Sequence, residues 1–198
     1  MFKIIKHVKV YESNWLAVYE DILDSGQNTK RQEVYNKIVT FDTSHIVPLL
    51  DDASLLMVET YRNGAGKRLL ELPGGFLNAG ERPRDAAKRE LLEETGYSSK
   101  VMKYLTYTYT WPGRSTQRNY IFWATGLTKI DDPKPEPFEK IKTIKLSSKQ
   151  IASEILTGRI RSSSSISAIF MSYLLQGINL PIPARIRVSG TRKRPKFA

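Results

Sequence analysis

The sequence has no cysteine among its 198 residues, which excludes disulfide bonds, thiol catalysis and cysteine-based metal sites. Its two histidines, His7 and His45, are too few and too far apart for a histidine-based metal site, so we expect both to be structural or exposed. It also lacks an apolar run of the roughly 18 residues that a membrane-spanning helix requires. The N-terminal stretch MFKIIKHVKVYESNW alternates like a strand and lacks the continuous apolar core of a signal peptide. We therefore expect a cytoplasmic protein without a membrane span.

Acidic residues are the minority charge: 20 aspartates and glutamates face 31 lysines and arginines, a formal net charge of +11. A strongly basic protein is expected to bind an anion, either nucleic acid or a small anionic substrate. Nucleic acid is the less favoured partner, because no RNA-binding signature with interleaved aromatic residues is present. A basic tail at the end of the chain is expected to be solvated, and its charged residues are Arg185, Arg187, Arg192, Lys193, Arg194 and Lys196.

The most informative segment runs from Gly75 to Tyr97 and reads GFLNAGERPRDAAKRELLEETGY. Pro83 suits the first turn of a helix, where its missing N–H costs nothing, and Gly96 suits the position just past the end. The segment between them therefore predicts a helix of about three turns. Glutamates spaced i, i+3 and i+4 along this helix place their carboxylates on one face; they are Glu90, Glu93 and Glu94.

Carboxylates gathered on one helix face repel one another, by roughly 0.2–0.5 kcal/mol per pair when exposed. A hard divalent cation such as Mg²⁺ or Mn²⁺ would cancel that repulsion, because such ions prefer oxygen ligands. The alternative is an acidic helix face that only meets solvent. Glu81 and Arg89 stand at fixed offsets from the same cluster, and Arg89 can orient or partly neutralise a neighbouring carboxylate, so we favour the metal site.

The whole segment resembles the Nudix box, G-x5-E-x7-R-E-U-x-E-E-x-G-U, where U is a bulky aliphatic residue. Every glycine and charged position of this pattern is filled, and only Tyr97 departs from it, at the last U. The resemblance implies a metal-dependent pyrophosphohydrolase.

The same resemblance implies the metal ligands. Glu90 and Glu94 are expected to bind the metals directly, and Glu93 either directly or through a water molecule. The family pattern adds the backbone carbonyl of Gly74 and places Glu81 near the metals. Gly74 and its neighbouring glycine would allow a close backbone approach.

The chain divides into three parts. Residues 1–41 predict two or three strands, residues 42–180 carry the box between further strands and two closing helices, and residues 181–198 form the basic tail. This order resembles the Nudix α/β/α sandwich, an α+β fold with a mixed sheet, here preceded by an N-terminal antiparallel strand segment. An apolar stripe on the closing helices predicts core packing by Leu156, Ile160, Ile166, Ile169, Phe170 and Leu174.

Sequence segments outside the box resemble the ADP-ribose pyrophosphatase subfamily: VETYR, LELPGG, a proline fifteen residues after the box at Pro112, and TGRIRSSSSISAIFMSYL. The resemblance implies hydrolysis of the diphosphate of ADP-ribose or a related nucleoside diphosphate sugar, giving AMP and ribose 5-phosphate. One alternative is a Nudix enzyme for a dinucleoside polyphosphate, NADH or an RNA 5′ end. A non-catalytic nucleotide- or nucleic-acid-binding module is the other alternative, and the intact glutamate set argues against it.

Substrate contacts follow from the same resemblance. Arg62, at the end of VETYR, is expected to bind a phosphate, because a guanidinium binds phosphate oxygens in a fork. Glu71 in LELPGG would hydrogen-bond ribose or brace the arginine. Arg114 and Arg118 flank the loop after Pro112 and are expected to meet the distal phosphate or ribose.

The general base and the adenine platform leave several candidates. In the resembling enzymes the base is often a glutamate beyond the proline marker, so Glu136 and Glu139 are candidates. Glu139 is the better match because it precedes the strand IKTIKL, and Glu93 is the alternative. An adenine ring would stack on an aromatic side chain, for which the candidates are Trp15, Tyr35 and Trp111.

The N-terminal strand segment bears on assembly. In the resembling family such strands often cross to a second subunit and complete its site. Residues 1–41 are strand-like and precede the box domain, so we expect a homodimer. The expected partners are therefore a nucleoside diphosphate small molecule and a second copy of the chain.

Overall fold

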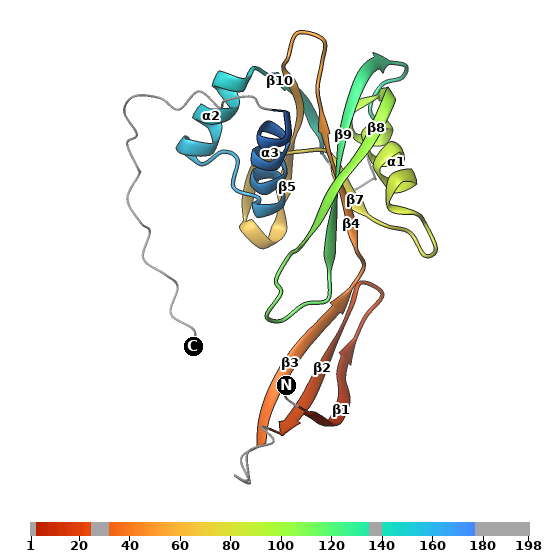
Figure 1. Ribbon diagram of the computed structural model, residues 1–198, viewed down its shortest axis with the longest axis vertical. Helices are drawn as coiled ribbons and strands as arrows, with labels where there is room; N and C mark the ends of the chain where they lie inside the picture. Colours follow the sequence, from red (N-terminus) through yellow and green to blue (C-terminus); the bar gives the residue numbers. More distant parts are fainter. Residues whose placement is uncertain (1–2, 25–31, 135–139, 177–198) are drawn as a thin grey trace.

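The computed structural model describes residues 3–24, 32–134 and 140–176. Three antiparallel strands form a small sheet, in the order β1-β2-β3, that projects from one end of the molecule (Figure 1). Their bounds are Lys3–Glu12, Leu16–Asp24 and Gln32–Thr40. The N-terminal antiparallel strand segment predicted from the sequence is therefore present.

This N-terminal sheet has almost no interior of its own, because its side chains other than Asp21 are exposed or partly exposed. Asp21 is 3% exposed, and its carboxylate binds His7 of β1 and, at 3.1 Å, Nζ of Lys37 of β3. Burial by itself raises the pKa of Asp21, but the hydrogen bonds from His7 and Lys37 outweigh it and leave the pKa lower than 3.8. One buried carboxylate thus links three strands. The exposed apolar side chains of the sheet include Ile4, Ile5, Val10, Tyr11 and Val34.

Two further sheets form the body of the molecule. One has four strands in the order β7-β4-β9-β8 and is mixed, because β4 and β9 run parallel. The other has three antiparallel strands in the order β10-β5-β6. The strands are β4 Thr43–Pro48, β5 Leu55–Arg62, β6 Lys67–Glu71, β7 Gly74–Phe76, β8 Tyr97–Tyr109, β9 Arg118–Lys129 and β10 Lys142–Leu146; the helices are η1 Asn63–Ala65, α1 Pro83–Thr95, α2 Ser148–Thr157 and α3 Ser163–Gln176.

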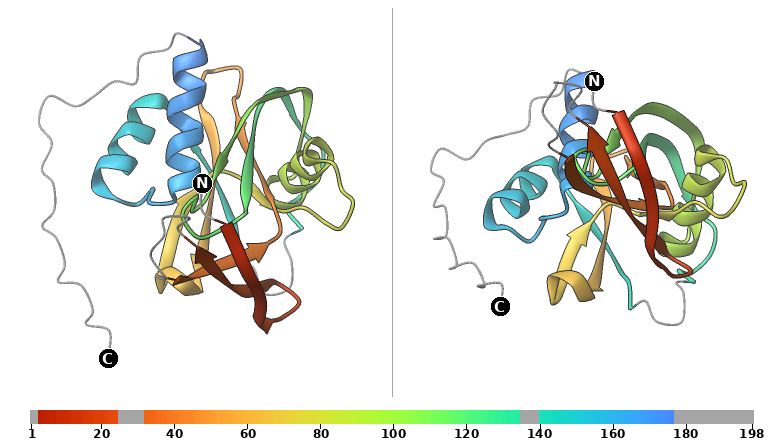
Figure 2. Two further views of the ribbon diagram at one scale, coloured as in Figure 1. Left: turned by 60° about the horizontal axis from the view of Figure 1, so that its bottom comes forward. Right: turned by 90° about the horizontal axis from the view of Figure 1, so that it is seen from below.

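Helices cover both faces of the mixed sheet (Figures 1 and 2). On one face α1 packs through Leu91 against a small buried cluster that includes Ile46 and Phe122. On the other face α2, α3 and the three-stranded sheet share a larger core that includes Val47 and Ile169. The predicted α+β fold, with a mixed sheet between helical layers, is confirmed. Within the described ranges no helix is long and apolar enough to cross a membrane.

Helix α1 has the ends that the sequence predicts. It begins at Pro83, and Gly96 follows its last residue in the left-handed conformation, with φ 76° and its N–H bonded to the carbonyl of Leu92. A side chain at Gly96 would also collide with the backbone, because a Cβ there would lie 2.1 Å from the carbonyl oxygen of Asp131. Strand β8 starts at Tyr97, so the residue that departs from the box pattern opens a strand.

The closing helices differ from the predicted core stripe. Ile160 and Ile169 are buried, but Phe170 is 45% exposed and Leu174 is 78% exposed. A helix that packs on one side buries only a stripe of its surface, and α3 turns Ile169 and Tyr173 inward. The prediction of core packing was therefore wrong for Phe170 and Leu174.

Candidate active site

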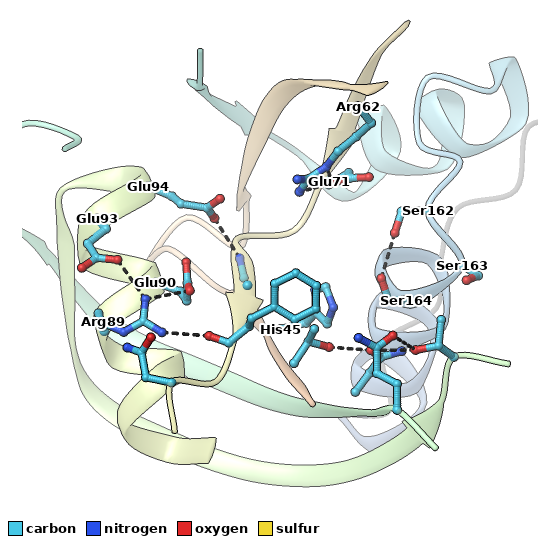
Figure 3. Close-up of a pocket in the computed structure, with 18 of the residues that line it drawn as sticks. His45, Arg62, Glu71, Arg89, Glu90, Glu93, Glu94, Ser162, Ser163 and Ser164 are labelled. Carbon is cyan, nitrogen blue, oxygen red and sulfur yellow. Dashed lines mark hydrogen bonds and ion pairs between the residues drawn. The ribbon is translucent and has the colours of Figure 1, made fainter. Parts of the chain in front are cut away.

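A pocket of about 480 Å³ opens between α1 and the start of α3, within the size range of small-molecule sites (Figure 3). Its lining comes from the box helix α1, the ends of strands in the two sheets of the body, the start of α3 and the ring of Trp15, between β1 and β2 of the N-terminal sheet. The charged residues of the lining are Arg62, Glu71, Arg89, Glu90, Glu93 and Glu94.

Arg89 lies among the box carboxylates. Its Nη1 donates to Oε1 of Glu90 at 2.8 Å and to Oε2 of Glu93 at 3.0 Å. Its Nε and Nη2 donate to the two oxygens of Glu81, each at 3.0 Å, and Nη2 also donates to the carbonyl oxygen of Phe76 at 3.0 Å. The hydrogen bond with Glu81 is the main reason that the pKa of Arg89 is raised and that of Glu81 is lowered. This arrangement fits the orienting role predicted for Arg89.

Glu90 and Glu94 reach the backbone of two glycines in β7. Glu94 is 3% exposed, and its Oε2 accepts a hydrogen bond from the N–H of Gly74 at 2.8 Å. A Cβ on Gly75 would lie 2.4 Å from Oε1 of Glu90, and a Cβ on Gly74 would lie 2.2 Å from the carbonyl oxygen of Ser44. The glycine pair therefore allows the close backbone approach that the sequence predicts.

The donor set has the chemistry of a Mg²⁺ or Mn²⁺ site, because it consists of carboxylate oxygens and a backbone carbonyl. Among residues 3–24, 32–134 and 140–176, however, no three acidic or histidine side chains form a group that could hold a metal ion. Arg89 instead bridges Glu90 and Glu93 and supplies the positive charge between them. These oxygen ligands are therefore of the kind that a divalent cation prefers, but in this structure the carboxylates of Glu81, Glu90 and Glu93 surround the guanidinium of Arg89.

Arg62 and Glu71 form a close pair at another edge of the pocket. Nε and Nη2 of Arg62 lie 2.9 and 2.8 Å from Oε2 of Glu71, which is 8% exposed. Glu71 is thus placed to hold the guanidinium of Arg62 in position, which is one of the two roles that the sequence left open. Burial, followed by the charge of Arg62, lowers the pKa of the nearby His45 to about 4, so this imidazole is neutral at pH 7.

The uncharged side of the pocket was not predicted. There Thr43 of β4 lies opposite Asn119 of the parallel strand β9, and residues 162–164 lie at the start of α3. Asn119 and Thr43 are 76 positions apart, so no local pattern could have joined them. The run of serines at 162–165 was the one signal in the sequence that pointed to this side.

Arg114 and Arg118 do not line the pocket. The guanidinium of Arg114 lies 4.3 Å from the ring centroid of Tyr35, and its Nη1 donates to the carbonyl of Asn36 at 3.3 Å. Arg118 pairs with Asp42 at 2.9 Å. Both side chains contact residues on or just after β3, so neither lines this pocket, and their substrate contacts stay predictions.

The three aromatic candidates have different surroundings. Trp15 lines the pocket, with its ring centroid 6.2 Å from that of Phe76. The ring of Tyr35 is covered by Arg114. Trp111 is 55% exposed and does not contribute to the lining. Of the three, Trp15 alone is placed to meet a ligand in this pocket.

The two preferred base candidates, Glu136 and Glu139, lie outside the described residues. The chain just before them is held near the box helix, because the N–H of Lys134 donates to the carbonyl of Glu93 at 2.7 Å. Lys134, the last described residue before them, thus lies beside the carboxyl end of α1. Glu93, the alternative base, lines the pocket.

A sequence profile of the NUDIX domain matches residues 40–163, which is more than half of the chain and includes the whole box. The fold and the glutamate-bearing helix define the same class, and the chain belongs to the Nudix family. It is a Nudix hydrolase, a class of enzymes that generally use divalent metal ions.

The chain is also similar to individual proteins. The chain is 29% identical over 170 residues to a methanol dehydrogenase activator of Bacillus methanolicus, covering 84% of this chain and 90% of that protein. It is 30% identical over 132 residues to an ADP-ribose pyrophosphatase of Bacillus subtilis (strain 168), covering 66% and 69% of the two chains. A crystal structure of an ADP compounds hydrolase superposes with a TM-score of 0.77 at 22% identity, covering 89% of this chain and 95% of the other, a likeness of fold.

Proposed function

We propose that this chain hydrolyses the diphosphate of ADP-ribose, or of a related nucleoside diphosphate sugar, to AMP and ribose 5-phosphate, using Mg²⁺ or Mn²⁺. The observation that carries the proposal is one pocket that joins the box glutamates, Arg62 and Trp15. The glutamates suit a metal-bound diphosphate, Arg62 suits a phosphate and Trp15 suits an adenine ring. Similarity to ADP-ribose pyrophosphatases supports the same substrate class.

A bound divalent cation would neutralise the diphosphate oxygens and lower the pKa of the attacking water. Glu90, Glu94 and the carbonyl of Gly74 are the residues that would hold it. Arg89 orients the carboxylate of Glu90, and Glu81 supports Arg89 through two hydrogen bonds. Because Glu94 is nearly buried and bonded to Gly74, its carboxylate is held in position before any substrate arrives.

The remaining residues position the substrate and move one proton. A guanidinium carries five N–H donors, so Arg62 can bind a phosphate while Glu71 holds its orientation. Water attacks one phosphorus, the bond from this phosphorus to the bridging oxygen breaks, and the proton of the water passes to a base. Glu139 is our first candidate for that base and Glu93 is the alternative.

The N-terminal sheet has two roles in this proposal. Trp15 stacks on the adenine, a contact worth roughly 1–3 kcal/mol in nucleic-acid complexes. The exposed apolar side chains of the sheet pack against a second copy of the chain, so that residues 1–41 serve dimerisation and base binding while residues 42–180 carry the hydrolase site. We place the enzyme in the cytoplasm, and its basic tail, residues 181–198, lies outside the described residues.

The test is a side-by-side comparison of kcat/KM for ADP-ribose, a dinucleoside polyphosphate, NADH and 5′-triphosphate RNA, with Mg²⁺, with Mn²⁺ and with a chelator. We expect ADP-ribose to be preferred by at least about tenfold, AMP to appear as product and the chelator to abolish turnover. A tenfold preference for RNA or the polyphosphate would overturn the proposed substrate.

A further inference from the structure

The pocket has a charged half and an uncharged half. The charged half consists of the α1 carboxylates, Arg89 and the Arg62–Glu71 pair. The opposite wall consists of the ends of β4 and β9 and the first residues of α3, and its described lining carries no carboxylate, lysine or arginine (Figure 3). The hydrolytic mechanism proposed above makes no use of this half.

Asn119 lies in the uncharged half and is only 4% exposed. Its Oδ1 accepts a hydrogen bond from Oγ1 of Thr43 at 2.5 Å and lies 3.1 Å from Oγ1 of Thr110. The hydroxyl of Thr43 sets the orientation of the amide, because the single proton of the Thr110 hydroxyl is also offered to Oε1 of Gln117 at 2.7 Å. Nδ2 of Asn119 is therefore directed away from Thr43. Within the described ranges this Nδ2 makes no hydrogen bond. The buried side-chain atoms without a partner there are Nδ1 of His45 and Oγ of Ser99, so Nδ2 of Asn119 is open to the pocket and can donate to a ligand.

The neighbouring residues add further polar groups without a partner. The first N–H groups of a helix have no acceptor within the helix, and in the described structure those of Ser163 and Ser164 have none elsewhere. Both serines line the pocket and carry hydroxyls that can donate or accept. Nδ1 of His45, on the same face of β4 as Thr43, is buried and likewise unbonded.

We propose that this half of the pocket is a subsite for the hydroxyl groups of a ribose, in which Nδ2 of Asn119 donates to a sugar oxygen. The inference rests on the proposed function and names the part of the substrate that lies beside the diphosphate. Uncharged donors paired with hydroxyls suit a neutral polyhydroxyl group, because each sugar hydroxyl can both donate and accept a hydrogen bond. Asn119 would then determine the specificity of the enzyme for a substrate with ribose hydroxyls.

The experiment pairs a change in the protein with a change in the substrate. Wild-type enzyme and Asn119→Ala are each given ADP-ribose, an analogue lacking one hydroxyl of the terminal ribose, and the analogue with 2′-deoxyadenosine. The two analogues distinguish which ribose occupies the subsite. Asn78→Ala is the matched control, because Asn78 lines the same pocket but is exposed.

We expect the wild type to prefer ADP-ribose over one of the two analogues by about tenfold in kcat/KM, the effect of one neutral hydrogen bond. Asn119→Ala should lose this preference, while Asn78→Ala keeps it. A purely structural role for Asn119 would lower activity on all three substrates equally and would overturn the proposal.

The wild-type measurement alone decides the matter if Asn119→Ala does not fold. A wild type that cleaves ADP-ribose and both analogues equally well contradicts the ribose subsite and leaves the proposed function intact. A wild type that does not cleave ADP-ribose contradicts the proposed function, and the ribose subsite with it.

Discussion

Replacing Glu94 with glutamine tests the metal site with little disturbance of the fold. Oε2 of Glu94 accepts the Gly74 N–H at 2.8 Å, and a glutamine oxygen can accept the same bond. A hydrogen bond to a charged group contributes roughly 1.5–3 kcal/mol and a neutral one roughly 0.5–1.5 kcal/mol. Glu94→Gln should therefore cost about 1 kcal/mol, a small part of a typical total stability of about 5–15 kcal/mol. The expected fall in Tm is about 2–4 °C.

Catalysis should respond far more strongly than stability. A neutral amide cannot replace the charge that a carboxylate offers to a divalent cation, so kcat should fall by at least about 100-fold, or ~2.7 kcal/mol of barrier. The assay combines kcat at saturating Mg²⁺, Mn²⁺ affinity by calorimetry and Tm. Glu154→Gln on α2 is the control, because Glu154 pairs with Arg159 at 3.0 Å and does not line the pocket.

Near-normal kcat together with unchanged Mn²⁺ affinity in Glu94→Gln would show that the carboxylate of Glu94 binds no catalytic metal. A large loss of Tm would show instead that the charge serves the fold. Glu154→Gln should change neither kcat nor metal affinity.

Three further predictions concern other parts of the molecule. Gly75→Ala places a Cβ 2.4 Å from Oε1 of Glu90, so kcat should fall at least about tenfold with little change in Tm. Gly113→Ala is the control and should retain activity, because a Cβ there meets no atom within 4 Å. Equal activities of the two variants would contradict a functional role for the close approach of Glu90 to Gly75. The pKa of Asp21 is lowered in the folded protein, so its stabilising effect is present above its ordinary pKa of 3.8 and is lost as the pH falls further. The Tm difference between wild type and Asp21→Asn should therefore shrink below about pH 4, and a difference that is the same at about pH 3 and about pH 5 would count against the ion pairs. Light scattering should give about twice the chain mass of 22.6 kDa, and a fully active monomer would exclude the dimer.

The box helix was predictable because its signals are local. The first-turn proline, the left-handed glycine after the last turn and three glutamates on one face all act within α1 and its flanks. The rest of the site depends on contacts between distant parts of the chain. Arg118 stands beside the predicted loop, but its partner Asp42 is 76 positions away and draws the guanidinium toward the N-terminal sheet.

The exposed residues of α3 show a similar limit. Periodicity predicts that an apolar stripe exists, but which side of the helix meets the sheet depends on the angle at which the helix packs. Phe170 lies next to the buried Ile169, yet nearly half of its surface is exposed. For Leu174, the same geometry leaves most of the side chain uncovered.

The chemical class of this protein could be predicted from local sequence alone, because the spacing of the box residues specifies a helix face and the carboxylates on it. The other side chains of the pocket could not be predicted in this way, because they come together only in the folded chain. The parallel pairing of β4 with β9 aligns Thr43 with Asn119, and the position of α3 brings its serines to the opposite wall from α1. Strand register and helix placement arise from packing across the whole core, so their consequences cannot be read from short stretches of sequence.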